Sequence, residues 1–280
     1  MRHIPLLLSA AIFALAPAFA HAADAPAATA TPVSTPAAAS TPANGHQFTD
    51  AQRAEIENII KEYVTKKNPQ ALMEGLQNFQ AQQQNEALAK SQAALTTDHD
   101  KVYGDPNSPV GGNPKGDVTV VEFFDYQCGY CKMAEPNVEK LLKEDKNIKF
   151  IYKEYPILGP TSVLASKAAL ASIRQNKDKY EKFHSALMTA NFTHGQKPAQ
   201  DEELVYKLAK DNGLDVTKLK KDMEDPELEK IVEANVALGE EVGARGTPTF
   251  IINDTISPGA MEYDAMKKSI SEARSGKKPG

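Results

Sequence analysis

Cys128 and Cys131 are the residues of this 280-residue sequence with the clearest capacity for chemistry, and they are its only cysteines. They lie between an apolar run at 118–124, typical of a buried strand, and a helix-like run at 131–143. A thiol at a helix N-terminus is stabilised as a thiolate, because unpaired backbone N–H groups and the helix dipole favour an anion there. The pattern predicts a redox-active pair. Cys128 is the reactive thiol, and Cys131, one turn along, is the resolving thiol.

Two other interpretations of the cysteine pair are an inert disulfide and a zinc site. An inert disulfide would close a very short loop and therefore constrain the unfolded chain weakly. Zinc needs about four ligands, whereas this pair with scattered histidines supplies two. His184, within a helix-like segment, is read as a packing or surface residue rather than a ligand. We therefore expect redox chemistry with no metal and no other cofactor.

The first 22 residues are typical of a secretory signal peptide, with a short basic start, an apolar stretch and a small-x-small end at 20–22. Its removal would take away one basic residue, Arg2, and no acidic one, so the formal net charge would move from −5 to −6. That balance argues against nucleic acid as a partner. The sequence predicts an exported, periplasmic protein, in a compartment where disulfides form and persist.

Two further segments precede the cysteine-containing part. Residues 23–45 are almost wholly Ala, Pro, Thr and Ser, and are expected to be a disordered linker. Residues 46–100 are expected to be helical, with starts at Thr49 and Asn68. Their apolar stripe consists of Ile56, Ile59, Ile60, Tyr63, Val64, Leu72, Leu76 and Phe79. A polar segment at 80–100 separates most of this stripe from the rest, which favours a homo-oligomer over helices that fold back on their own domain.

Residues 101–280 combine strand and helix patterns, which indicates an α/β domain. A Gly-, Pro- and Asn-rich entry at 104–117 precedes strands at 118–124 and 148–153, expected to be parallel through a helical crossover. The signal is helical from about 160 to 242. A strand near 246–253, a short edge strand at 255–257 and a last helix at 261–274 complete the domain.

Three motifs in this domain together resemble the DsbA-like branch of the thioredoxin superfamily. They are Val-Glu-Phe-Phe-Asp-Tyr-Gln-Cys-Gly-Tyr-Cys-Lys at 121–132, Lys-Glu-Tyr-Pro-Ile-Leu-Gly at 153–159 and Gly-Thr-Pro-Thr-Phe at 246–250. The resemblance covers roughly residues 103–273. It implies an α/β thioredoxin fold with a helical insertion at about 160–242, preceded by an N-terminal helical extension.

The resemblance also implies roles for residues outside the cysteine pair. Thr247–Pro248 would be a cis bond that faces the cysteines and offers backbone groups to a substrate polypeptide; an ordinary trans turn is the alternative. Glu122 would be a buried acid near the resolving thiol that passes protons. An exposed glutamate on an edge strand is the alternative for Glu122.

The motif details bear on the direction of the redox reaction. The Gly129–Tyr130 dipeptide and Thr247 resemble DsbC and the oligomeric ScsC-type isomerases more than monomeric DsbA oxidants, and they place no basic group beside Cys128. Lys132 is expected to compensate in part. The resemblance implies formation or isomerisation of disulfides in cysteine-containing exported polypeptides, with a membrane oxidase or reductase as redox partner. The alternative is an oligomeric periplasmic chaperone or copper-handling protein that uses the same thiols.

Overall fold

The computed structural model describes residues 48–276. The expected signal peptide at 1–22 and linker at 23–45 lie outside the described residues. The chain divides into two compact units, one ending at Glu62 and one beginning at Tyr63. Each is described by itself below. Within the described range, no helix combines the length and the apolar character needed to cross a membrane.

The described part of the first unit is a single helix, α1 (Asp50–Glu62). It begins with the reciprocal cap expected at Thr49: the Thr49 N–H donates to Gln52 Oε1 at 3.0 Å, and the Gln52 N–H donates to Thr49 Oγ1 at 3.3 Å. No residue of α1 is buried within the structure. The isoleucines of its apolar stripe are therefore exposed.

The second unit begins with a π-helical turn (Tyr63–Lys67) and the long helix α2 (Pro69–Thr97). The Asn68 side chain accepts from the Ala71 N–H at 3.3 Å, and Pro69 occupies the first turn, where a backbone N–H is not needed. The apolar pattern fades after Phe79, yet the helix is continuous to Thr97. The Ala- and Gln-rich segment that follows has high intrinsic helix propensity, which sustains the helix without an apolar stripe.

A five-stranded mixed sheet forms the centre of the second unit, in the order β1-β3-β2-β4-β5. Its strands are β1 (Val110–Gly112), β2 (Val118–Phe124), β3 (Ile148–Glu154), β4 (Thr249–Ile252) and β5 (Thr255–Pro258). β2 and β3 are parallel and are joined by helix α4 (Gly129–Glu144), which confirms the expected crossover. The other neighbouring strands pair antiparallel. Because β2 is the central strand, the cysteine motif lies at the C-terminal end of β2, midway across the sheet.

Strand β1 is an element that the sequence did not predict, since residues 104–117 were identified only as the entry to the domain. It pairs antiparallel with β3, with Val110 opposite Ile151 and Gly112 opposite Lys149. Three residues, two of them glycine, are too few to show the alternation by which a strand is recognised in sequence. The pairing with β3 therefore comes from the tertiary structure.

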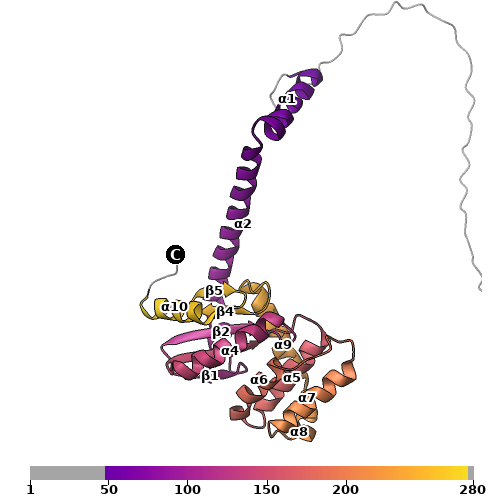
Figure 1. Ribbon diagram of the computed structural model, residues 1–280, viewed down its shortest axis with the longest axis vertical. Coiled ribbons are helices and arrows are strands. Elements are labelled where there is room, and N and C mark those ends of the chain that lie inside the picture. The colour runs from indigo at the N-terminus through magenta and orange to yellow at the C-terminus, as the bar shows by residue number, and fades with distance from the viewer. Residues whose placement is uncertain (1–47, 277–280) are drawn as a thin grey trace, which may run out of the picture. The chain divides into compact units, whose positions relative to one another are not determined.

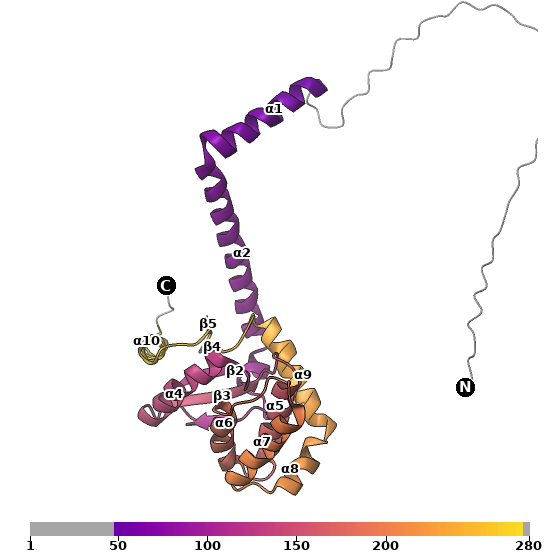
Figure 2. The ribbon, with the colours of Figure 1, turned by 45° about the vertical axis from the view of Figure 1, so that its right-hand side comes forward.

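Every regular element of the insertion between β3 and β4 is a helix, as expected for residues 160–242. It comprises α5 (Pro160–Ile173), a 3-10 turn (Lys177–Lys179), α6 (Tyr180–Met188), α7 (Pro198–Asp211), α8 (Val216–Met223) and α9 (Pro226–Glu241). Asp215 and Asp225 cap α8 and α9 by accepting backbone N–H groups. Figure 2 shows these helices gathered beside the sheet. The last helix, α10 (Tyr263–Arg274), follows β5.

The two faces of the sheet are covered by different helices. Residues 118, 120 and 124 of β2 belong to a core shared with α4, α6 and α10, whereas Val121 and Phe123 face a second core on the other side. The second core includes Leu95 of α2, Val102 of α3 (His99–Tyr103) and Leu238 of α9. Figure 1 shows only the C-terminal end of α2 beside the sheet. The last turns of α2 are thus part of the domain core, inside the region 46–100 that the sequence assigns to oligomerisation.

Candidate active site

The cysteine motif lies where strand β2 ends and helix α4 begins. Cys128 is the residue that precedes the first turn of α4, with an extended backbone (φ −75°, ψ 117°), and its carbonyl accepts from the Lys132 N–H at 3.1 Å. Cys131 lies in the first turn and is 1% exposed, against 7% for Cys128. Both are free thiols. The strand–motif–helix geometry expected from the sequence is confirmed.

The loop that precedes β4 contacts Cys128. Thr247–Pro248 is a cis peptide bond, as expected. In its protonated form Cys128 Sγ donates to the Thr247 carbonyl oxygen at 3.1 Å. β4 pairs antiparallel with β2, with Thr249 opposite Phe123. Because of this pairing, the loop lies at the same end of the strands as the dithiol, although 119 residues separate Cys128 from Thr247.

The two thiols have opposite proton affinities. The pKa of Cys128 is lowered from 9.0 to about 5, first by a hydrogen bond from the Cys131 side chain, and further by Thr247 and by the backbone N–H groups of Tyr130 and Cys131. Burial opposes this shift. The pKa of Cys131 is raised, first by burial and then by its hydrogen bond to Cys128. Near neutral pH the pair therefore consists of an exchange-competent thiolate and a protonated thiol beside it.

The Lys132 side chain interacts with groups other than the Cys128 thiolate that it was expected to stabilise. Its ammonium group donates to the Ala190 carbonyl oxygen and lies 5.8 Å from the centre of the Phe192 ring. The groups that lower the pKa of Cys128 are the hydrogen-bond donors of the motif and of the cis-proline loop. The thiolate is thus stabilised by short-range hydrogen bonds rather than by this lysine.

Glu122 lies on the central strand and is 2% exposed, which rules out an exposed glutamate on an edge strand. Burial raises its pKa well above the usual range, and the charges of Glu135 and Cys128 raise it further. Its Oε2 atom is buried without a hydrogen-bond partner in the described structure. The pKa of Cys131 is in turn raised by the charge of Glu122, so the acid and the second thiol are electrostatically coupled.

Asp125 organises the loops around the motif, a role that the sequence analysis missed. Its carboxylate accepts from the Gln127 N–H at 2.8 Å, the Leu158 N–H at 2.9 Å and the Ser162 hydroxyl at 2.7 Å. These bonds tie the segment after β2 to the segment after β3. An aspartate directly after a strand and before Cys-x-x-Cys is the only sequence signal of this role.

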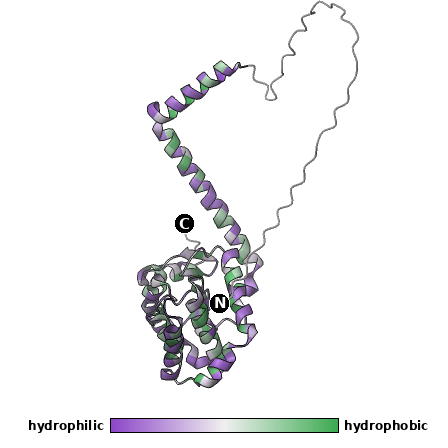
Figure 3. Ribbon diagram, turned by 90° about the vertical axis from the view of Figure 1, so that its right-hand side faces the viewer, coloured by the Kyte–Doolittle hydropathy of each residue, from purple (hydrophilic) through white to green (hydrophobic). Residues whose placement is uncertain are grey.

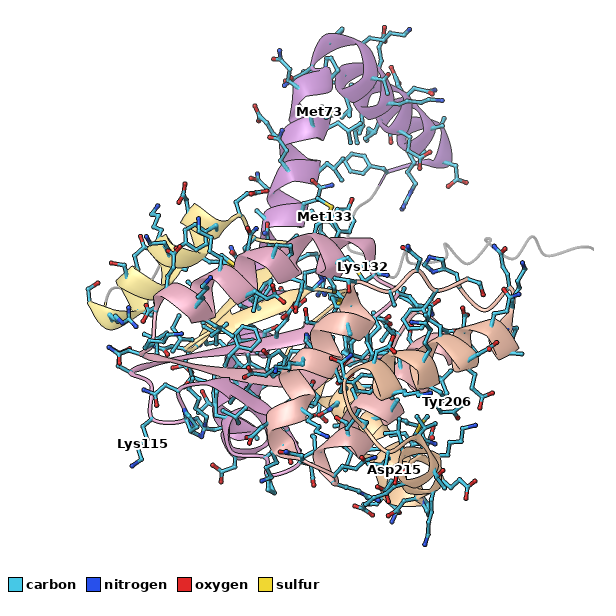
Figure 4. The ribbon with its side chains drawn as sticks, turned by 60° about the horizontal axis from the view of Figure 1, so that its bottom comes forward. Met73, Lys115, Lys132, Met133, Tyr206 and Asp215 are labelled. Atoms are coloured by element: carbon cyan, nitrogen blue, oxygen red, sulfur yellow. The ribbon has the colours of Figure 1, made fainter. Side chains whose placement is uncertain are left out.

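Exposed apolar side chains surround the motif. Tyr130 and Met133, each 65% exposed, lie on the first turns of α4, and Ile157 and Leu158 lie on the loop that Asp125 holds. Figure 4 shows Met133 next to Lys132 on α4. Solvent-exposed apolar side chains beside a reactive site are typical of a surface that binds another molecule.

Glu135 and His184 are further buried residues near the motif that sequence reasoning did not assign to the site. Glu135 follows Cys131 by four residues on α4 and therefore lies on the same helix face, a spacing that could have identified it. His184 comes from α6 and has no such local signal. Among the described residues, no group of three or more His, Cys, Asp or Glu side chains is arranged to hold a metal ion.

A thioredoxin-type sheet with a strand–Cys-x-x-Cys–helix junction opposite a cis-proline loop defines a class of dithiol oxidoreductases. Residues 119–271, more than half of the chain, match the family model of the DSBA-like thioredoxin domain. The chain therefore belongs to the DsbA-like family of thiol–disulfide oxidoreductases.

Some of the curated relatives are named for disulfide bond formation and others are not. The chain is 28% identical over 191 residues to disulfide bond formation protein D of Bacillus subtilis, covering 64% of this chain and 84% of that protein. It also matches the Na(+)/H(+) antiporter NhaA 3 of Salinispora tropica at 24% identity, but spans only 27% of that protein.

Two solved structures show how far the likeness extends. A thioredoxin-like oxidoreductase from Silicibacter pomeroyi is 42% identical, with a TM-score of 0.58, over 63% of this chain and 97% of that chain. ScsC from Proteus mirabilis, in a transitional conformation, is 26% identical, with a TM-score of 0.59, over 82% of this chain and 100% of that chain. The match to ScsC thus covers more of this chain than the 66% that is matched by the catalytic domain of Proteus mirabilis ScsC alone.

Proposed function

We propose that this protein is an exported thiol–disulfide interchange protein that forms or isomerises disulfides in cysteine-containing exported polypeptides. Cys128 is the nucleophile and Cys131 the resolving thiol. The observation that carries this proposal is the position of the two free thiols at the start of α4, with Cys128 Sγ 3.1 Å from the carbonyl oxygen of Thr247 in the cis-proline loop. The lowered pKa of Cys128 and the raised pKa of Cys131 support it. A thiol with a low pKa is both ionised near neutral pH and a good leaving group, which are the two requirements of rapid exchange.

As an oxidant, the protein starts with a Cys128–Cys131 disulfide. A substrate thiolate attacks Cys128 Sγ, the bond between the two cysteines breaks, and Cys131 leaves as a thiolate that takes up a proton. A second substrate thiolate then attacks the substrate sulfur of the mixed disulfide, and Cys128 leaves as a thiolate. Two electrons pass from the substrate to the protein.

As an isomerase, the protein starts as the dithiol. The Cys128 thiolate attacks a wrong substrate disulfide and forms a mixed disulfide, and the freed substrate thiolate attacks another disulfide of the same polypeptide. A substrate thiolate released in this way then attacks the substrate sulfur bonded to Cys128, and Cys128 leaves as a thiolate. No net oxidation occurs. A membrane oxidase or reductase would return the pair to its starting state in either mode.

Polypeptide substrates are supported by the surroundings of the motif. The Thr247 and Pro248 loop offers backbone groups next to Cys128, and Tyr130, Met133, Ile157 and Leu158 offer apolar contacts. An unfolded or misfolded chain presents both extended backbone and apolar side chains. This combination suits such substrates better than a small thiol.

A homo-oligomer through residues 46–100 is supported by the apolar side chains of both helices of this region. In α2, Leu72, Leu76 and Phe79 recur at helical spacing and are exposed. In α1, Ile56, Ile59 and Ile60 are likewise exposed. Figure 3 shows apolar residues along both helices. Burial of these side chains against other copies would bring several active sites into one assembly, which favours isomerase activity over simple oxidation.

Refolding of scrambled ribonuclease by the purified protein, with its mass in solution recorded on the same sample, tests the proposal. We expect unscrambling activity from an oligomer and its loss when residues 23–87 are deleted, a truncation that leaves Leu95 in place. Cys131→Ser should accumulate mixed disulfides with substrate, and Cys128→Ser should be inactive. A monomer that oxidises thiols without unscrambling would refute the oligomeric isomerase, and full turnover by Cys131→Ser would refute the assigned roles.

A copper-handling or chaperone function would use the same cysteine pair or the same helices. Cu(I) is a soft ion suited to thiolates. Titration of the reduced protein with Cu(I), compared with the double Cys128→Ser, Cys131→Ser variant, distinguishes this function from thiol exchange.

A further inference from the structure

Two exposed apolar side chains beside the dithiol belong to a loop without regular structure. Ile157 is 41% exposed and Leu158 is 49% exposed, and residues 155–159, between β3 and α5, form neither helix nor strand. Together with Tyr130 and Met133 on α4, the two side chains make an uncharged surface next to the motif. A loop of this kind can point its side chains in many directions unless other groups fix its backbone. The groups that fix it therefore decide what this surface offers to a substrate.

The backbone of Leu158 is held by the segment that leads to Cys128. Its N–H donates to Asp125 Oδ2 at 2.9 Å, and its carbonyl oxygen accepts from Gln127 Nε2 at 3.4 Å. The Asp125 carbonyl oxygen in turn accepts from the Cys128 N–H at 3.0 Å. Asp125 thus holds the reactive cysteine through its backbone and the apolar loop through its side chain.

Asp125 is also bound to the start of α5, which fixes the far end of the loop. Its Oδ1 accepts from Ser162 Oγ at 2.7 Å, and both residues are fully buried. The neighbouring Thr161 hydroxyl donates to Asp201 Oδ2 at 2.9 Å, and Asp201 Oδ1 accepts from the Thr193 N–H at 2.7 Å. Two buried acidic side chains therefore anchor the start of α5, and the apolar loop runs between fixed points.

An aspartate fits the centre of this arrangement better than its amide would. The Gln127 N–H donates to Oδ1 at 2.8 Å and the Leu158 N–H donates to Oδ2 at 2.9 Å. Both oxygens thus accept from backbone groups that can only donate. An asparagine has one oxygen and one NH2 group, and in either orientation the NH2 group meets one of these N–H groups. Asp125→Asn therefore breaks one of the two backbone bonds with almost no change of volume.

We propose that Asp125 is a positioning residue that gives this protein a preference for polypeptides with apolar side chains next to their cysteines. It fixes Ile157 and Leu158 beside Cys128 before a substrate arrives, so that binding does not have to order the loop. A substrate of this kind covers Leu158 while its cysteine reaches Cys128. The proposal rests on the proposed thiol exchange at Cys128 and Cys131.

The test is the oxidation of two short peptides by the Cys128–Cys131 disulfide of the full protein. Both peptides carry the same two cysteines, which are flanked by leucines in one peptide and by serines in the other. In each turnover the peptide gains a disulfide and the protein ends as the dithiol, so only the flanking contacts differ. Single-turnover rates, measured against peptide concentration by acid quenching and mass spectrometry, separate the half-saturating concentration from the maximal rate.

We expect the unaltered protein to be half-saturated at a lower concentration of the leucine peptide than of the serine peptide. With Asp125→Asn, the half-saturating concentration of the leucine peptide should rise about tenfold, the factor that corresponds to covering the exposed half of one leucine side chain. The maximal rate and the serine peptide should be affected much less. The matched control is Asp215→Asn, which changes a carboxylate that accepts from the Lys218 N–H in the cap of α8. Figure 4 shows Asp215 well away from Lys132 and Met133, so this variant should behave as the unaltered protein does.

A second change separates the position of Leu158 from a general loosening of the site. Leu158→Ala removes the side chain that Asp125 positions, so it should weaken binding of the leucine peptide by a similar factor. The double variant Asp125→Asn, Leu158→Ala should be no worse than Leu158→Ala, because the effects of two residues that act through one contact do not add. Ser162→Ala removes one of the bonds that hold Asp125 and should cause a smaller rise; it serves if Asp125→Asn does not fold.

The outcomes separate this inference from the proposed function. Three results would each overturn the inference while thiol exchange stands: no preference of the unaltered protein for the leucine peptide, equal effects of the Asp125 or Ser162 variant on the two peptides, or additive effects in the double variant. No oxidation of either peptide by the unaltered protein would overturn the proposed function and the inference with it.

Discussion

Replacing Cys131 with alanine should raise the pKa of Cys128, because the Cys131 side chain is the largest of the groups that lower that pKa to about 5. A hydrogen bond to a charged group contributes about 1.5–3 kcal/mol. At about 1.4 kcal/mol per pKa unit, its loss corresponds to a rise of about one to two units. Water can replace part of the lost bond because Cys128 is not fully buried, so the lower half of that range is expected.

The ultraviolet absorbance of the thiolate, titrated against pH, measures this shift directly. The baseline is the double variant Cys128→Ser, Cys131→Ala, and the rate of alkylation by iodoacetamide against pH gives an independent value. Cys131→Ser is the matched control, since its hydroxyl keeps a hydrogen-bond donor at nearly the same position. It should shift the pKa by less than alanine does.

Two results would refute this reasoning. An unchanged pKa in Cys131→Ala would mean that Thr247 and the backbone N–H groups of the helix start hold the thiolate by themselves. Equal shifts in the alanine and serine variants would mean that the side chain at position 131 acts through shape or solvent exclusion rather than by donating a hydrogen bond.

Two further predictions concern stability. Burial raises the pKa of Glu154 from 4.5 to about 7, so between these pH values the folded state keeps a proton that the unfolded state loses, and the free energy of unfolding falls by up to about 3 kcal/mol as pH rises. Glu154→Gln should abolish this fall when urea unfolding is measured against pH. The same pH dependence in the variant as in the unaltered protein would contradict the prediction. Leu95→Ala should cost about 2–5 kcal/mol because Leu95 is 1% exposed in the domain core. Leu88→Ala, at a 54% exposed position of the same helix, should change the unfolding free energy by less than about 0.5 kcal/mol, and equal losses at the two positions would show that α2 does not pack as described.

Several features of this protein follow from short stretches of sequence. An apolar run followed by Cys-x-x-Cys and a helical pattern predicts the β2–α4 junction, because strand and helix periodicities and the helix start are local properties. The starts of α1 and α2 were predicted from Thr49 with Gln52 and from Asn68 with Pro69. In each case the hydrogen bonds that decide the structure join residues no more than three positions apart.

Recognition of the family also came from the sequence, through motifs that are far apart. The Gly-Thr-Pro-Thr-Phe motif predicted the cis bond at Thr247–Pro248, which the structure contains. The motif by itself did not determine that the Thr247 carbonyl lies 3.1 Å from Cys128 Sγ. That distance depends on the antiparallel pairing of β4 with β2.

Only the tertiary structure decided which groups share the buried space behind the dithiol. Glu122, Glu135 and His184 lie on a strand and two different helices, and no local pattern relates His184 to the other two. The burial of all three and the raised pKa of Glu122 depend on surroundings and charges that folding brings together. The same is true of Leu95: its helix was foreseen, but a polar sequence around it gave no sign that the last turns pack into the core, because burial is a property of what the chain meets in space.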